Sequence, residues 1–212
     1  MANTNKVSGL TPVKYLNGAN WDGRGTMYYI DNTDGNAYYP GDPVKLAAGL
    51  DGVSGLQSVT LATAGATAVG AIIACGASPN TTSSLRGGPY IDPANLTLIS
   101  IPATKTKNYF VLVADDPMTV FSIQEGGTGT LLTKTATSKN ANFATAAPAT
   151  GVAVSGAFLD NGTAPNTTST MNLKLLGLAQ ILDNGVYNTY GLYAKWLCLI
   201  NNHSYRTGVA GI

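Results

Sequence analysis

Charged residues are scarce in this sequence. Charged residues make up 11% of the 212 residues, less than half of the roughly 25% that is usual in soluble domains. The 12 basic and 11 acidic residues leave a net charge of +1, and the lysines between Lys105 and Lys139 are spread out. Phosphate binding needs several basic side chains on one face, which argues against nucleic acid as a partner. A neutral surface rich in Thr, Ser, Asn and Gly instead favours a protein that is largely covered by protein partners.

Reactive side chains are also scarce. The chain has one histidine, His203, and two cysteines, Cys75 and Cys198. A zinc site takes three or four ligands, and no second cluster accompanies Cys198 and His203. Both cysteines lie in apolar runs, where buried, reduced thiols are expected, whereas a nucleophilic thiol needs exposure. We therefore expect no enzymatic activity, no metal and no cofactor.

Long hydrophobic stretches are missing. The longest apolar run, 68–77, covers about ten residues, whereas a membrane-spanning helix needs about 20. The first nine residues are polar and lack the apolar core of a secretory signal. The sequence predicts a protein that is made in a cytoplasm and does not enter a membrane.

Helical periodicity is weak throughout, and strand signals dominate. Residues 58–63 alternate apolar and polar side chains, and 69–75 is a fuller apolar run. For residues 138–145 the sequence is compatible with either a short helix or a loop. The pattern predicts an all-β fold, an antiparallel sandwich or jelly roll. The expected strands are 25–30, 43–46, 58–63, 69–75, 96–101, 108–113, 118–124, 152–159, 171–181 and 194–200.

Two turns carry carboxylates. Asp115 and Asp116 with Pro117 predict a tight turn that joins 108–113 and 118–124 as a hairpin. The stretch Asp31–Asn36 is similar to a calcium loop, but Ile30 stands where the first Asp should be, so a simple turn is the better interpretation.

The chain is expected to have an extended N-terminal arm, 1–20, and a single β-rich domain, 21–212. Two long loops, near 78–93 and 126–150, favour either contacts with neighbouring molecules or floppy surface insertions. We expect the arm to add a strand to the sheet edge of a neighbour.

Several phrases in order carry a resemblance that covers nearly the whole chain. They are Gly9–Gly18, Asn36–Ala47, Ile101–Thr106, Tyr109–Pro117, Phe121–Glu125, Leu173–Leu178 and Tyr193–His203. Together they resemble the capsid cement (decoration) proteins of tailed bacteriophages, notably short-tailed ones. The resemblance implies a structural virion protein with a jelly-roll or related β-fold. Such a protein binds the outside of the major capsid protein shell after expansion, often as a homodimer on two-fold axes, and has no catalytic residues.

An alternative from another class is a virion binding module, such as a tail or host-carbohydrate-binding β-domain. Tyrosine, 11 residues in all, concentrates toward both ends of the chain, and tyrosine is enriched at interfaces. The candidate contacts with the capsid or a second copy are Leu10, Pro12, Tyr15, Trp21, Tyr38, Tyr39, Tyr90, Tyr187, Tyr190, Tyr205 and Arg206.

Overall fold

The computed structural model describes residues 3–52, 54–77, 96–183 and 185–206. Within these ranges the chain is built of strands, with no α-helix and a single turn of 3-10 helix, η2 (Lys134–Ala136). Nearly all strand pairs are antiparallel, which confirms the all-β prediction. A jelly-roll topology in particular stays a prediction.

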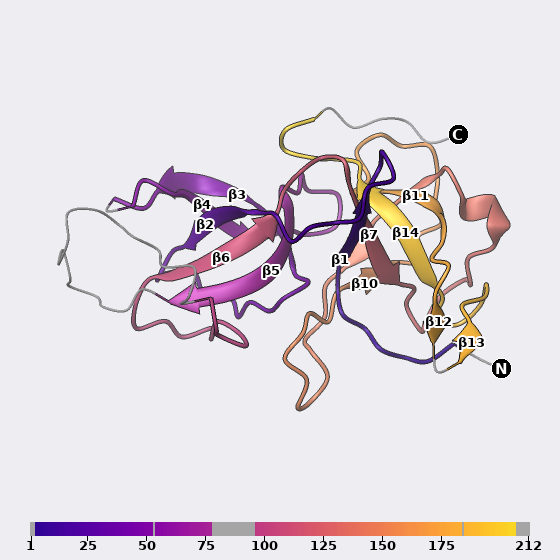
Figure 1. Ribbon diagram of the computed structural model, residues 1–212, viewed down its shortest axis with the longest axis horizontal. Coiled ribbons are helices and arrows are strands. Elements are labelled where there is room, and N and C mark those ends of the chain that lie inside the picture. The colour runs from indigo at the N-terminus through magenta and orange to yellow at the C-terminus, as the bar shows by residue number, and fades with distance from the viewer. Residues whose placement is uncertain (1–2, 53, 78–95, 184, 207–212) are drawn as a thin grey trace.

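One half of the molecule is a closed barrel, seen on the left in Figure 1. Its interior is filled by β-branched and aromatic side chains, which fit the pleated surface of strands. Tyr28, Ile30, Val44, Val59 and Val111 are among these buried residues. In spatial order its strands are β2 (Thr26–Ile30), β4 (Gln57–Leu61), β3 (Pro43–Leu50), β5 (Gly70–Ala77) and β6 (Tyr109–Ala114).

The other half is a five-stranded sheet with smaller ribbons around it, on the right in Figure 1. Its core holds Phe121, Phe143, Leu173, Leu175 and Trp196, all with almost no exposed surface. The sheet has the order β1 (Thr11–Tyr15), β7 (Thr119–Gln124), β14 (Lys195–Ile200), β11 (Leu173–Leu178) and β8 (Asn140–Ala141). The ribbons pair β9 (Phe143–Ala144) with β10 (Phe158–Leu159), and β12 (Leu182–Asp183) with β13 (Val186–Tyr187).

The predicted hairpin at Asp115–Pro117 is wrong in its pairing. Both strands exist, as β6 and β7, but β6 pairs with β2 and β5 in the barrel, and β7 pairs with β1 and β14 in the sheet. The turn therefore carries the chain across from the barrel to the sheet. The Asp and Pro residues of the turn determine only the local bend. Each strand pairs where its apolar side chains are buried, β6 in the barrel core and β7 in the sheet core.

The N-terminal arm is also not free. Residues 11–15 form β1, which pairs with β7 of the same chain, and Leu10 is buried in the sheet core. The outer edge of β1 is covered in turn by residues 19–21, since Tyr15 N donates to Ala19 O and Trp21 N to Val13 O. At Val13 and Tyr15 this edge is therefore already hydrogen-bonded within the chain, and removal of residues 1–20 would take a strand out of the sheet.

Of the two predicted loops, 126–150 is built into the fold. It contains η2, β8 and β9, and Leu132 and Ala136 join the sheet core. The strands β8 and β9 also occupy the stretch 138–145 that was open between helix and loop. The loop 78–93 lies outside the described residues. Of the predicted strands 96–101 and 152–159, the first makes only isolated bridges and the second is reduced to β10.

The barrel and the sheet are joined by a hydrogen-bonded seam. The Asn172 side chain accepts from Gly65 N at 2.8 Å and donates to Ala66 O at 2.6 Å. Gly9 and Gly41 allow two backbone segments to approach closely, because a Cβ on either residue would lie 2.1 Å from a carbonyl oxygen of the other segment. The two halves are thus fastened at several points that are distant in sequence.

Candidate functional site

The side chains that could support chemistry are buried. Cys75 and Cys198 are free thiols without exposed surface, and burial raises the pKa of both, that of Cys75 to about 12. His203 is almost fully buried, its Nδ1 accepts from Tyr205 N at 3.0 Å, and burial lowers its pKa. A buried thiol with a raised pKa, such as that of Cys75 or Cys198, is not a nucleophile near neutral pH.

The buried carboxylate of Glu125 is held in structural contacts. It accepts hydrogen bonds from Leu132 N at 2.7 Å, from Asn161 Nδ2 at 3.2 Å and from Trp196 Nε1 at 3.0 Å. In the described part of the chain, no three His, Cys, Asp or Glu side chains are gathered as metal ligands would be. These contacts give Glu125 the role of an anchor between the sheet core and the loop that follows β7.

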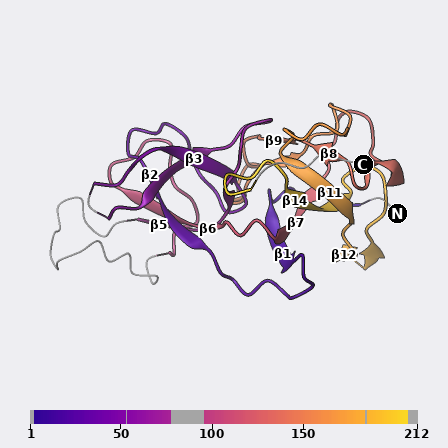
Figure 2. The same cartoon turned by 90° about the horizontal axis from the view of Figure 1, so that it is seen from above.

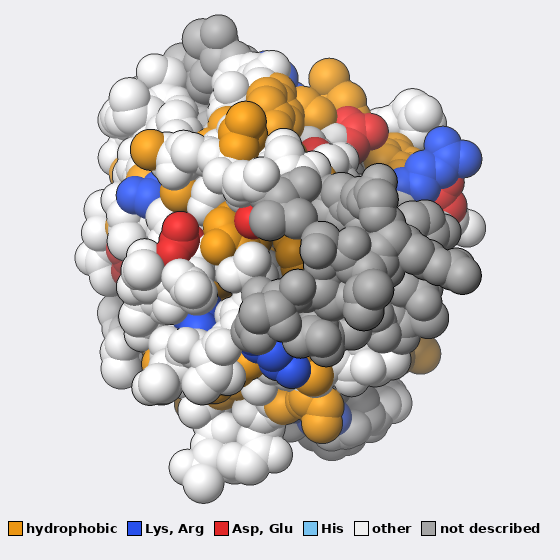
Figure 3. All heavy atoms as spheres, turned by 90° about the vertical axis from the view of Figure 1, so that its left-hand side faces the viewer, with side chains coloured by type: hydrophobic (Ala, Val, Ile, Leu, Met, Phe, Trp, Pro, Cys, Tyr) orange, Lys and Arg blue, Asp and Glu red, His pale blue; other side chains and the backbone are white. Residues whose placement is uncertain are grey.

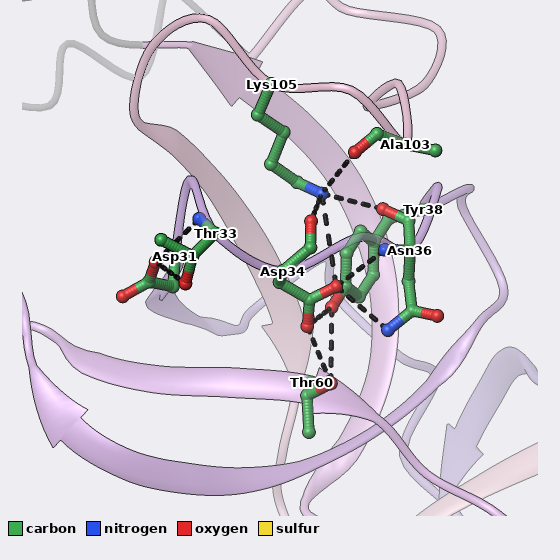
Figure 4. Close-up of polar contacts among 8 residues, drawn as sticks. All are labelled: Asp31, Thr33, Asp34, Asn36, Tyr38, Thr60, Ala103 and Lys105. Atoms are coloured by element: carbon green, nitrogen blue, oxygen red, sulfur yellow. Dashed lines mark hydrogen bonds and ion pairs between the residues drawn. The ribbon is translucent and has the colours of Figure 1, made fainter.

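In the turn Asp31–Asn36, which is similar to a calcium loop, the ammonium group of Lys105 binds the backbone oxygens (Figure 4). Lys105 Nζ donates to the carbonyl oxygens of Asp34, Asn36 and Ala103, at 2.7 Å for Asn36 and 3.5 Å for Ala103. The Asp34 carboxylate lies 4.0 Å away, and the Lys105 side chain has no exposed surface. Nζ also lies 5.2 Å from the centre of the Tyr38 ring. An ammonium group therefore stands among carbonyl and carboxylate oxygens.

Asp34 is the hub of this turn. It accepts from Tyr38 Oη at 2.6 Å, from Thr60 Oγ1 at 2.8 Å and from Asn36 N at 2.7 Å. Burial alone would raise the pKa of Asp34, but these hydrogen bonds outweigh it and the pKa is lowered. Burial lowers the pKa of Lys105, and the attraction of Asp34 opposes that effect. The cluster ties the turn after β2 to β4 and to the segment before β6.

A different region gathers exposed apolar side chains, and we call it the hairpin surface. It consists of Ile181, Leu182, Tyr187, Tyr190 and Leu192, all of which are exposed. Leu182 and Tyr187 are directly paired across β12 and β13, and are 61% and 70% exposed. Figures 1 and 2 place these two strands at the end of the molecule remote from the barrel. Single exposed apolar residues are normal, but a group of this kind usually marks an interaction site.

The hairpin surface is hydrogen-bonded to the sheet at its base. The Asn188 side chain donates to Ala179 O at 2.9 Å and to Lys195 O at 2.7 Å, and accepts from Lys195 N at 2.9 Å. Asn3 holds the following loop in the same way, with donors and acceptors to Thr189 and a bond to Leu192 O at 3.0 Å. A two-stranded ribbon is marginal alone, so these bonds hold it against the sheet.

Several predicted contact residues belong to the interior. Leu10 and Tyr38 have no exposed surface and serve the two cores, so these two predictions are wrong. Trp21 packs against the sheet core, and Tyr15 is half-buried with its hydroxyl on Asp22 at 2.9 Å.

Other predicted residues stand at or near the surface. Tyr187 and Tyr190 lie on the hairpin surface, and Tyr205 is 55% exposed with its hydroxyl 3.0 Å from that of Tyr28. Pro12, Tyr39 and Arg206 are half-buried, and Tyr90 lies outside the described residues.

Sequence reasoning missed Ile181, Leu182 and Leu192. The predicted strand 171–181 ends before β12, whereas the observed strand β11 covers only Leu173–Leu178. The dipeptide Asn184–Gly185 between apolar pairs is the strongest short-range hairpin signal, and it could have located the ribbon.

The barrel end of the molecule looks different. In Figure 3, outside the atoms drawn in grey, uncharged polar side chains and backbone cover most of this face, with several groups of hydrophobic side chains and scattered charged ones. Among the described residues, no helix is long and apolar enough to span a membrane.

Comparisons with known proteins found no matching family model, no similar curated protein and no similar solved structure.

Proposed function

We propose that this chain is a capsid cement protein of a tailed bacteriophage. It binds the outer surface of the shell formed by the major capsid protein, stabilises the expanded, DNA-filled head and associates with further copies of itself. The ordered phrases from Gly9–Gly18 to Tyr193–His203 support the proposal. The observation that carries it is the hairpin surface, because a protein that acts by contact needs an apolar surface held ready for a partner.

The energetics fit a protein that works in many copies. Full burial of a side chain such as Leu182 or Tyr187 contributes about 1.5–3 kcal/mol, and association costs several kcal/mol of lost freedom. One hairpin contact is therefore weak by itself. Linked copies on a lattice bind together far more tightly than one copy, and a protein that binds only the expanded shell stabilises that state by mass action.

The test is co-sedimentation of the purified protein with expanded empty shells. Leu182→Ser should reduce occupancy about tenfold, because it removes an apolar contact from the centre of the hairpin surface. Leu50→Ser is the matched control, since Leu50 is 62% exposed at the end of β3 and Leu182 is 61% exposed. Equal occupancy of the two variants would exclude the hairpin surface, and absence of wild-type binding would refute the cement function.

A further inference from the structure

A second pair of exposed apolar side chains lies outside the hairpin surface. Leu16 N donates to Met118 O at 2.8 Å, so the two residues are neighbours, and both are exposed. They line a hollow of about 730 Å³, which we call the crossing hollow, where the connection from β1 to β2 meets the crossing from β6 to β7. Its other lining residues are Tyr15, Asn17, Asp22, Arg24, Gly25, Thr26, Asp115 and Asp116.

The crossing hollow carries an excess of negative charge. Its lining has three carboxylates, Asp22, Asp115 and Asp116, against the guanidinium of Arg24. Arg24 Nε pairs with Asp22 at 2.8 Å, and no ion pair among the described residues involves the other two. The whole chain has only 11 acidic residues, so three at one hollow is a marked concentration.

The carboxylates of Asp115 and Asp116, which make no ion pair among the described residues, are each oriented by a hydrogen bond. Asp115 Oδ2 accepts from Tyr28 Oη at 2.8 Å, and Asp116 Oδ1 accepts from Met118 N at 2.7 Å. The guanidinium of the nearby Arg206 donates to Pro117 O and Ile200 O, and among the described residues it makes no ion pair with either aspartate. Each aspartate therefore keeps an oxygen that no hydrogen bond among the described residues uses.

We infer that the crossing hollow is a second contact site for the capsid shell, which accepts a lysine or arginine side chain of the shell protein. This inference rests on the proposed function. Long basic side chains lay their alkyl stem on apolar surface and keep the charged head at polar groups. Leu16 and Met118 provide the apolar wall, and Asp115 and Asp116 provide the complementary charge. Acidic side chains of a partner would be repelled here.

The crossing hollow and the base of the hairpin surface lie at opposite ends of β7. Met118 directly precedes β7, and Lys195, which holds the base of the hairpin surface, pairs with Gln124 at the other end of β7. At about 3.3 Å per residue, the strand itself spans about 17 Å between its first and last residues, and the two sites lie beyond its two ends. One sheet thus connects two contacts of different chemistry, so a single copy can hold two points of the shell at once. Simultaneous engagement raises the affinity above that of either site alone.

The test uses the full chain and expanded shells at low and high ionic strength. Asp116→Lys should weaken binding about tenfold or more, because it places like charges against each other, and it should reduce the salt dependence of binding. Asp160→Lys is the matched control, since Asp160 Oδ1 accepts from Gly162 N at 2.8 Å in the same local turn geometry. Met118→Ser should weaken binding without a change in salt dependence, and Val152→Ser, at 46% exposure against 45%, is its control.

The outcomes separate the two proposals. If wild type binds, Leu182→Ser releases it, and Asp116→Lys and Met118→Ser differ from their controls as described, the crossing hollow is a contact site. If wild type binds but both hollow variants behave like their controls, the inference is overturned and the cement function stands. If wild type does not bind expanded shells, both are overturned.

Discussion

Replacement of Lys105 by methionine tests whether the buried ammonium holds the barrel end together. Methionine keeps the length and the apolar stem of the side chain but removes the charge and all three donors. The carbonyls of Asp34, Asn36 and Ala103 would lose their shared donor. The Asp34 carboxylate would lose the nearby cation.

The expected loss in the free energy of unfolding follows from the buried Asp34 carboxylate, which the substitution leaves without its cation. Removal of one partner from a buried charge pair typically costs about 3–5 kcal/mol. Asp34 keeps its hydrogen bonds from Tyr38, Thr60 and Asn36, which places the expected loss near the lower limit, at about 3 kcal/mol. For a chain of this size, that corresponds to a fall in Tm of roughly 6–12 °C.

The assay is urea and thermal unfolding followed by circular dichroism. Lys107→Met is the control, because Lys107 Nζ lies 6.0 Å from the centre of the Tyr109 ring and its loss should cost below about 0.5 kcal/mol. The double variant Lys105→Met with Asp34→Asn should be less destabilised than the sum of the single variants, because the stranded charge is gone. Equal stability of Lys105→Met and Lys107→Met would refute the role of the ammonium.

Three further predictions concern the interior. Burial raises the pKa of Asp42 to about 6, so its contribution to stability is fully present below the unfolded pKa near 4 and is lost as the pH rises through 6. Urea midpoints should fall from pH 5 to pH 7.5, and Asp42→Asn should flatten that part of the profile; an unchanged slope would contradict the burial effect. The buried thiols of Cys75 and Cys198 should not react with a thiol reagent in the native protein, whereas both should react in denaturant; rapid native labelling would show that a thiol is accessible. Gly9→Ala places a Cβ 2.1 Å from Gly41 O at a φ of +67°, so it should cost more than about 2 kcal/mol in urea unfolding, and a near-neutral effect would mean that this seam yields easily.

The existence of most strands could be predicted because β-rich, alternating segments carry a local signal. The stretch 108–113 nearly coincides with β6, and 118–124 with β7. Their partners could not be predicted, since a turn of Asp and Pro is compatible with a hairpin and with a crossing. The strand β1 falls within the predicted arm, because the segment opens with polar residues and contains Pro12 and the turn dipeptide Asn17–Gly18.

The candidate site was predictable only in part. Tyr187 and Tyr190 were found through the concentration of tyrosine toward the chain ends, whereas Leu182 was hidden because exposure depends on packing. The pairing of Lys105 with Asp34 joins residues separated by 71 positions, and a single sequence contains no signal for such a contact. The cement function itself rests on the resemblance and on surface chemistry, and the experiments above decide it.

The barrel lies in the sequence between two strands of the sheet that pair with each other, β1 and β7. Thr11 pairs with Ser122, and the five barrel strands lie between these residues in the sequence. Closure of so long a loop is costly in chain entropy when nothing within it is ordered. Once the barrel has formed, its first and last strands, β2 and β6, are neighbours, and the two sheet strands are already close together. A formed barrel therefore lowers the entropic cost of pairing β1 with β7 in the sheet that supports the hairpin surface.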